Sequence, residues 1–505
     1  MSDAAHPRVG GLGHKRYLRR VVLVVITLVA ITLMGLAIEW TRFAYVRPTV
    51  ARDFVAEANA RIAAIPAEQR AMPLIERACA NLTQTALLSV VAKGGVVGRV
   101  RADSAAWADA VNYVDSNGAS LVDTREAAKR PQLGAPLIAD VDPNRPNEPP
   151  LLSNNLTPHV SSLQQVGRLL AQAVIVECER SDMINAIEDV IASLRLVKFM
   201  AHDGATIEQI LATNSFFGVC DIMVRDVLPK TAGLSQPQRD ALRRELREVV
   251  VHDGRTLGLS FEVDRDEFLD MVQRVYSDNG NGDGRILSSE CDLFMKTLAG
   301  RVPASQVPIR AGSGFWKFPM SHWCATRAET IAAHDAIMRE AAIEAERAPY
   351  EWRAMDQRSD YVGPVLRTSR DMRRHPLVTL TCNTRSWEVA VRRAWDARQQ
   401  QVAVDVGFAI EQFRAREGRV PELLTELVPR DMDAVPIDMF DGKPLKYVVR
   451  GGEPLLYSVG PDGVDDGAAG SFSCGWSRGP TSNDFVLYPY MANPSEPEST
   501  DPNAK

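Results

Sequence analysis

The sequence predicts a mostly α-helical protein: an N-terminal transmembrane helix, a helical ectodomain, and a C-terminal α+β module built as one long helix on a small antiparallel sheet. Three observations support this prediction. Residues 21–38 form an unbroken apolar run, apolar residues then recur at helical spacing over most of the chain, and short strand-like runs between turn residues follow near its end. The 505 residues, 45% of them hydrophobic, suffice for two or three cores.

Composition excludes some classes of partner and motif. The net charge of -6 and the pI near 5.9 provide no global basic field, so no nucleic acid partner is expected. The seven cysteines include no CxxC pair, so neither a zinc ribbon nor a thioredoxin-like motif is present. Their state stays open between one or two disulfides outside the cytoplasm and buried free thiols.

The apolar run predicts a membrane anchor. The run VVLVVITLVAITLMGLAI carries no charge, and at ~1.5 Å rise per residue it spans a bilayer core together with its flanks. We therefore expect residues 21–40 to cross the cell inner membrane once, with Trp40 at the far interface. Basic side chains between Arg8 and Arg20 predict a cytoplasmic segment at residues 1–20 and an extracytoplasmic bulk.

Two other interpretations of the apolar run remain. A cleaved signal peptide has an apolar core of only ~7–15 residues and a small-residue cleavage site. Here the core is longer, and Gly35-Leu36-Ala37 is a poor site. The second alternative is a buried helix of a globular core.

Residues 41–385 are predicted to form a helical ectodomain. Apolar residues recur at helical spacing on both sides of a turn at Arg180 to Asp182, which predicts a helical hairpin that includes Ile184. Residues 130–156 are rich in Pro, Asn and Asp and predict an extended surface loop. The polar tail 491–505 is expected to be disordered.

Residues 386–490 predict a different kind of module. Apolar residues mark one face of a long helix that ends near Gly418, and strand-like runs follow at 445–449, 455–459 and 485–488. Turns rich in Asp, Gly and Pro separate these runs. We therefore expect one helix laid across a small antiparallel sheet.

The motifs of this module resemble the globular domain of the major pseudopilin of type II secretion. They are IEQFRAREGRVPELLTELVPRDMDAVPIDMFDGKPLKY, then LLYSVGPDGVDDG and the closing NDFVLY. The resemblance implies a pseudopilin-like fold and a calcium ion held by the loop around the Gly-Pro-Asp-Gly turn and by a later aspartate. The matching positions are Asp462 and Asp484, with Asp465 and Asp466 nearby. The alternative is that these acids make solvated turns.

A second acidic loop, NGNGDGRILSSE at 279–290, has EF-hand spacing. Gly284 falls at the sharp turn and Ile286 at the apolar eighth position. Only two ligands carry formal charge, so any calcium binding is weak, in the ~0.1–1 mM range. The alternative is a structural turn that needs its Gly and Asn for backbone reasons. The expected ligands are Asn279, Asn281, Asp283, the Arg285 carbonyl and Glu290.

No catalytic residues are predicted. The sequence contains no GxSxG elbow, P-loop or GxGxxG motif, and His322, Cys324 and His334 match no standard zinc spacing. No small-molecule substrate is identified.

The sequence therefore favours a membrane-anchored extracytoplasmic structural or interaction protein. Its expected partners are the bilayer, through residues 21–40, and an unknown envelope protein. Two other hypotheses remain: an accessory component of a type II secretion-like apparatus, and an enzyme whose site is dispersed along the chain. The whole chain, including MVQRVYSDNGNGDGR, also resembles large uncharacterised envelope proteins of planctomycete-type bacteria.

Overall fold

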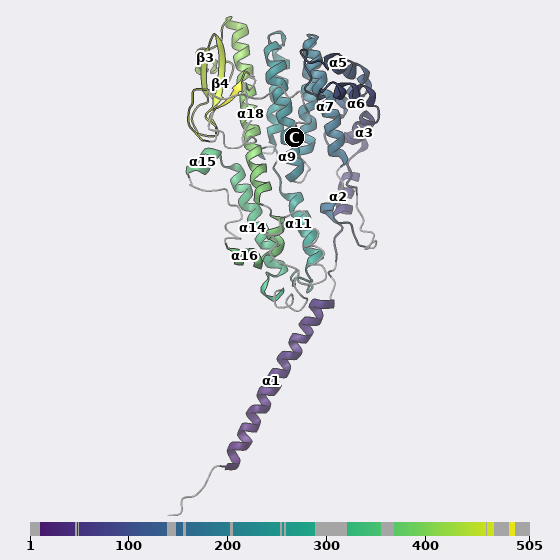
Figure 1. Cartoon of the computed structure of the whole chain (residues 1–505), viewed down its shortest axis with the longest axis vertical. Coiled ribbons are helices and arrows are strands. Elements are labelled where there is room, and N and C mark those ends of the chain that lie inside the picture. Colours follow the sequence, from purple (N-terminus) through teal and green to yellow (C-terminus); the bar gives the residue numbers. More distant parts are fainter. Residues whose placement is uncertain are drawn as a thin grey trace, which may run out of the picture. The chain divides into compact units, whose positions relative to one another are not determined.

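A computed structural model gives the fold, which is mostly helical with a small antiparallel sheet near the C-terminus (Figure 1). This confirms the coarse fold class. The ranges that the structure describes are 11–45, 48, 50–138, 148–154, 158–202, 206–252, 255–256, 259–287, 321–354, 368–382, 384–460, 462–468 and 484–489. The predicted tail 491–505 lies outside them.

The chain divides into two compact units. The small unit comprises Met1–Ala51, Met271–His334 and Leu366–Thr381. The large unit comprises Arg52–Asp270, Asp335–Val365 and Cys382–Lys505, so it contains most of the predicted ectodomain and the whole C-terminal module.

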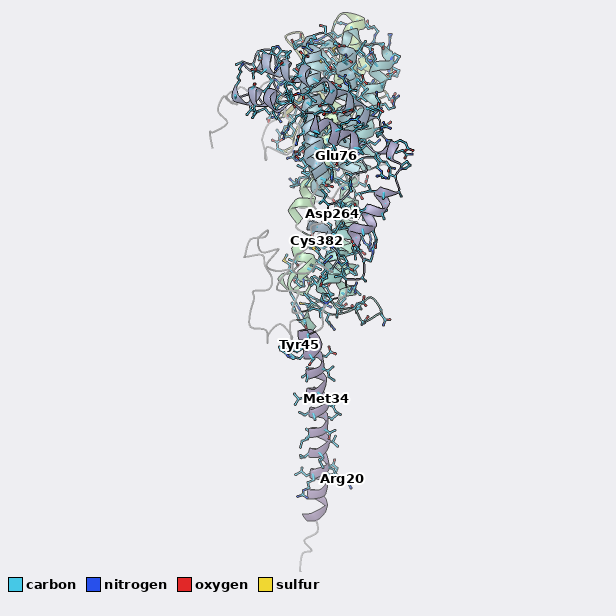
Figure 2. The ribbon with its side chains drawn as sticks, turned by 90° about the vertical axis from the view of Figure 1, so that its right-hand side faces the viewer. Arg20, Met34, Tyr45, Glu76, Asp264 and Cys382 are labelled. Atoms are coloured by element: carbon cyan, nitrogen blue, oxygen red, sulfur yellow. The ribbon has the colours of Figure 1, made fainter. Side chains whose placement is uncertain are left out.

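The small unit begins with α1 (Gly11–Tyr45), whose residues Tyr17–Thr41 are long and apolar enough to cross a membrane. None of the apolar window in this stretch is buried, and side chains project from all sides of the helix (Figure 2). Thr27 and Thr32 donate their hydroxyls to carbonyls one turn earlier, at 2.9 and 2.8 Å. These bonds satisfy polar groups that hydrocarbon cannot. At ~1.5 Å per residue the 35-residue helix is about 52 Å long, so it extends beyond a ~30 Å hydrocarbon core.

Among the remaining described elements, α16 and α17 are short helices of the small unit, whereas α11 and α14 each have one end in the small unit and the other in the large unit. These elements are α11 (Glu262–Val275), α14 (Arg327–Glu346), α16 (Ser369–Arg374) and α17 (Pro376–Thr381).

A layer of short helices opens the large unit. Asn59 of α2 exchanges two hydrogen bonds with the backbone of Leu137, at 2.8 and 3.0 Å, which ties down one end of the predicted 130–156 loop. Leu152, at its other end, is buried with Phe54 and Val55 of α2. The elements are α2 (Phe54–Ala63), η1 (Ala67–Gln69), α3 (Met72–Ala80), α4 (Gln84–Ala92), α5 (Trp107–Ser116), α6 (Gly118–Ala128) and η2 (Leu152–Asn154).

Long helices form the core of the large unit, and α7, α9 and α18 run alongside one another (Figure 1). The predicted hairpin is confirmed, because α7 ends at Glu179 and α8 begins at Met183, with Ser181 at φ 61° in the turn. Ile184 continues the apolar period of the predicted hairpin but is 70% exposed, in the first turn of α8. The elements are α7 (Pro158–Glu179), α8 (Met183–His202), α9 (Thr206–Ile222), a π-helical turn η3 (Met223–Val227), η4 (Leu228–Gly233), α10 (Gln236–Val250), β1 (Val251–His252), β2 (Arg255–Thr256) and α15 (Pro349–Ala354).

The C-terminal module consists of α18 (Thr384–Glu417), η5 (Leu424–Leu427) and an antiparallel sheet in the order β3-β4-β5. The predicted helix end is confirmed, because Gly418 follows α18 with φ 73°. Gly451 and Gly452, both at positive φ, close the two-residue hairpin between β3 and β4. The strands are β3 (Lys446–Arg450), β4 (Glu453–Ser458) and β5 (Phe485–Tyr488).

A glycine lets α18 approach its neighbours closely. A Cβ added at Gly407 would lie 2.7 Å from Leu228 Cδ1 and 3.3 Å from the Tyr488 ring. On the sheet side, the Phe440 and Phe485 rings meet edge to face at 5.7 Å. The long helix is thus packed against both the helical core and the sheet.

Candidate functional sites

A buried aspartate holds the C-terminal module together. Asp438 is fully buried and accepts hydrogen bonds from Phe440 N (3.0 Å), Ser458 Oγ (2.8 Å) and Val459 N (2.9 Å). Burial raises the pKa of its carboxyl, and the three donors act against that rise. The carboxylate thereby joins the loop before β3 to the end of β4. Sequence analysis did not single it out, although it lies within the quoted pseudopilin-like string.

The structure brings three of the four acids predicted around the Gly-Pro-Asp-Gly turn close together. Asp484 is buried and accepts from Asp466 N (3.2 Å) and Ala468 N (2.6 Å). Burial raises the pKa of Asp484, and the charges of Asp465 and Asp466 raise it further. Asp462 instead accepts from Val464 N (3.1 Å) within its own turn.

Asp465 has partners of its own. It accepts from Tyr457 OH and Gly467 N, both at 3.1 Å, and Lys446 Nζ lies 3.5 Å away. Asp462 and Asp466 are exposed. The loop therefore presents carboxylates to solvent next to a buried one.

In the EF-hand-like loop, the predicted ligands make hydrogen bonds within the loop and to α14. Asn279 Oδ1 accepts from Asn281 N (2.9 Å) and Asp283 N (3.3 Å), and Asp283 Oδ1 accepts from Ala328 N (3.0 Å). The Arg285 carbonyl accepts from Ser277 N at 2.9 Å. The predicted ligand Glu290 lies outside the described residues.

Gly284 meets a different requirement from the one expected. The left-handed conformations of this loop are at Gly280 (φ 85°) and Gly282 (φ 80°), not at Gly284. A Cβ at Gly284 would lie 2.0 Å from the Ser277 carbonyl oxygen. Close approach of the two backbone segments, rather than a turn with positive φ, therefore demands glycine at this position.

Asp278 fastens the same loop to α14. Its carboxylate accepts from Gly280 N (2.8 Å) and forms an ion pair with Arg327. The Gly280 hydrogen bond first, and then Arg327, lower the pKa of Asp278. Sequence analysis placed Asp278 one position before the ligand set, and its partner Arg327 lies far along the chain.

An ionic cluster inside the helical core also escaped sequence analysis. Arg125 of α6 binds Asp189 of α8 through two hydrogen bonds, at 2.5 and 2.9 Å, and Glu177 of α7 at 2.9 Å. Burial, and then the charge of Asp189, raise the pKa of Glu177 to about 8. One arginine thus faces two carboxylates, and burial raises the pKa of both Glu177 and Asp189.

A shallow hollow of about 300 Å³ lies along α10, lined by Asp240, Arg243, Arg244, Arg247 and Glu248. Two of its three arginines have a structural partner, because Arg243 and Arg247 both bind Asp405 of α18 through Nε, at 3.0 and 2.9 Å.

Histidine and cysteine side chains do not assemble a site in the part of the chain that the structure describes. His322 is exposed, whereas Cys324 and His334 are buried. Among the described residues, no group of three His, Cys, Asp or Glu side chains could hold a metal ion. Cys79 and Cys178 are free thiols, and burial raises the pKa of Cys178 to about 12.

Comparisons with protein-family models, with curated proteins and with solved structures found no match to this chain. The geometry of the chain itself must therefore carry any functional argument.

Proposed function

We propose that this protein is a structural or interaction protein anchored in the cell inner membrane, with its N-terminus in the cytoplasm and its bulk outside. The observation that carries this proposal is the stretch Tyr17–Thr41 of α1, which is apolar and has no buried residues in its hydrophobic window. Such a helix is stable in lipid and costly in water. The arginines and lysine before it favour retention of the N-terminus inside.

The C-terminal module is the proposed interaction element, and we infer that it is pseudopilin-like. Three features support this: one long helix on a three-stranded antiparallel sheet, a glycine directly after the helix, and a loop held to the sheet by Asp438. Its proposed partner is another protein of the envelope.

We further propose calcium for the loop around Asp462, Asp465, Asp466 and Asp484. The support for a cation is the repulsion at Asp484, where burial and the charges of Asp465 and Asp466 raise the pKa, because a divalent ion would offset that repulsion. It is not a ready-formed ligand set, since no three His, Cys, Asp or Glu side chains among the described residues could hold a metal ion. The EF-hand-like loop is a weaker proposal, since Arg327 and the Ala328 amide already engage its aspartates. An ion that binds only the folded state stabilises that state by mass action.

Protease digestion of spheroplasts tests the topology. The full chain carries one epitope tag before Met1 and another after Lys505. External protease should destroy the C-terminal tag and spare the N-terminal tag until the membrane is lysed. Protection of the C-terminal tag would overturn the proposed orientation. Secretion of a chain that lacks the N-terminal tag would indicate cleavage.

Thermal melting of the full chain in detergent, with and without calcium, tests the ion. We expect a higher Tm with calcium, and a smaller shift in Asp462→Ala or Asp484→Asn. Glu290→Ala reports separately on the EF-hand-like loop. Asp433→Ala, which removes an exposed acid elsewhere in the module, is the matched control. An unchanged Tm in the parent would remove calcium from the proposal.

The pseudopilin-like geometry also favours a second role, as an accessory component of a type II secretion-like apparatus. In-cell crosslinking from an exposed residue of β3, such as Val449, tests it. Adducts with pseudopilins would support this role, and adducts only with other envelope proteins would contradict it.

A further inference from the structure

The small unit holds the chain immediately after the membrane span. Ala51 N donates to the side chain of Gln273 at 3.1 Å. About ten residues separate Thr41, the end of the span, from Ala51. Because an extended chain covers at most ~3.6 Å per residue, Ala51 lies within about 36 Å of that end. The small unit therefore stays close to whatever surface the span leaves.

Apart from α1, two large apolar side chains in the described part of this unit face solvent. Trp323 is 39% exposed and Met372 is 40% exposed. They lie on adjacent segments, because Ala325 N donates to the Arg374 carbonyl at 2.7 Å, two residues after each of them. Tryptophan is the side chain that most favours the boundary between lipid headgroups and acyl chains.

Two exposed arginines lie near this pair, Arg285 in space and Arg370 on the same short helix as Met372. Arg285 Nη1 donates to the carbonyls of His322 (3.4 Å) and Cys324 (3.5 Å), which places its guanidinium beside Trp323. Arg370, two residues before Met372, is exposed.

The local charge is opposite in sign to that of the whole chain. Segments 271–287, 321–334 and 368–381 carry six arginines against four acidic residues, whereas the chain as a whole has a net charge of -6. Exposed apolar side chains among arginines are typical of a surface that contacts anionic lipid.

We propose that Trp323, Met372, Arg285 and Arg370 form a lipid-contact surface, by which the small unit rests on the headgroups of the bilayer that α1 crosses. This inference rests on the proposed anchoring. The apolar pair enters the interface, and the guanidiniums bind lipid phosphates. The span then fixes the protein in the membrane, while the lipid-contact surface limits its tilt and distance.

Quenching of tryptophan emission by brominated phospholipids tests this proposal on the full chain in nanodiscs. Trp323→Phe should lose a measurable share of the quenching, because it removes a fluorophore at the interface. Trp40→Phe, at the end of the span, should lose a share as well. Trp395→Phe is the control, since Trp395 is 7% exposed within the large unit and should contribute none.

Two further variants sharpen the test. Met372→Trp should increase quenching if its position contacts lipid. Arg370→Glu should reduce the difference between nanodiscs that contain anionic lipid and nanodiscs of phosphatidylcholine alone.

The outcomes separate this proposal from the anchor. Loss of quenching in Trp40→Phe but not in Trp323→Phe, with no gain in Met372→Trp, would overturn the lipid-contact surface and leave the span intact. No loss in either tryptophan variant would overturn the anchor itself. Equal quenching losses with and without anionic lipid would remove the guanidiniums, but not the apolar pair, from the contact.

Discussion

The loop of residues 278–287 and the loop of residues 460–468 are both rich in glycine and aspartate, yet their carboxylates have different surroundings. In the first, Arg327 and backbone amides meet Asp278 and Asp283, and the pKa of each is lowered. In the second, Asp484 is buried next to Asp465 and Asp466, and its pKa is raised. The first loop pairs with Arg327 of α14, whereas the second places the buried Asp484 beside two further carboxylates, of which Asp465 has Lys446 Nζ at 3.5 Å. A similar composition thus produces a loop whose carboxylates have positive or amide partners in one place, and a candidate cation site in the other.

The largest expected effect comes from Gly284→Ala. Its Cβ would lie 2.0 Å from the Ser277 carbonyl, so the loop must shift, and we expect a loss of ~3 kcal/mol or more in the stability of the small unit. Gly280→Ala is the control: it has open space, and its positive φ costs only ~1–2 kcal/mol. Hydrogen exchange of the full chain measures both. Equal losses of stability in the two variants would show that the loop of residues 278–287 does not depend on the close approach of Gly284 to the Ser277 carbonyl.

Glu177→Gln extends the comparison to the helical core, where the carboxylates of Glu177 and Asp189 share one arginine, Arg125. The pKa of Glu177 rises from 4.5 to about 8 on folding, so the folded state holds its proton more tightly. Stability of the parent should therefore fall as pH rises from about 4.5 to about 8 and change no further above that window.

In Glu177→Gln, we expect ~1–3 kcal/mol of this decline to disappear. Melting curves across that window measure it, with the half-exposed Glu188→Gln as control. Parallel pH profiles for the parent and Glu177→Gln would contradict the raised pKa of Glu177.

Arg327→Ala tests whether the ion pair between Arg327 and Asp278 stabilises the loop of residues 278–287. The ordinary pKa of Asp278 is 3.8, and its folded value lies lower, so this group contributes stability above pH 3.8 that is lost as the pH falls through the folded pKa. The variant should be less stable than the parent at neutral pH, and the two should converge at low pH. Arg339→Ala, which removes an exposed arginine of the same helix, is the matched control. A gap that persists at low pH would assign the loss to packing instead of charge.

Asp466→Asn should have the smallest effect and the opposite sign. Removing one of two charges that face Asp484 relieves repulsion, so we expect a gain of a few tenths of a kcal/mol at neutral pH without calcium. With calcium present, the variant should instead gain less Tm than the parent. If the variant were less stable than the parent both with and without calcium, the Asp466 carboxylate would have a stabilising partner within the protein, as Asp278 does.

Local patterns predicted much of the fold. The helical hairpin, the end of α18 at Gly418 and the three strands all follow from apolar spacing and glycine turns within short windows. Ile184 shows the limit of such patterns, because the helical period continues into the first turn of α8, where this side chain is 70% exposed. The long-range ion pairs could not be predicted, since Arg327 binds Asp278 across 49 residues and Arg125 binds Asp189 across 64. Such pairs leave no local period in a sequence. The calcium assignments stay predictions, and Glu290 lies outside the described residues.

The position of α18 has a mechanical consequence. This one helix packs against α9 and α10 and also contacts β5. Its Gly407 lies close to the side chains of Leu228 and Tyr488. A truncation that removes the sheet would uncover apolar surface on the helices, so the module is unsuited to excision as an independent fragment. For the same reason, a force that a docked protein applies to the sheet would be transmitted through α18 to the helical core.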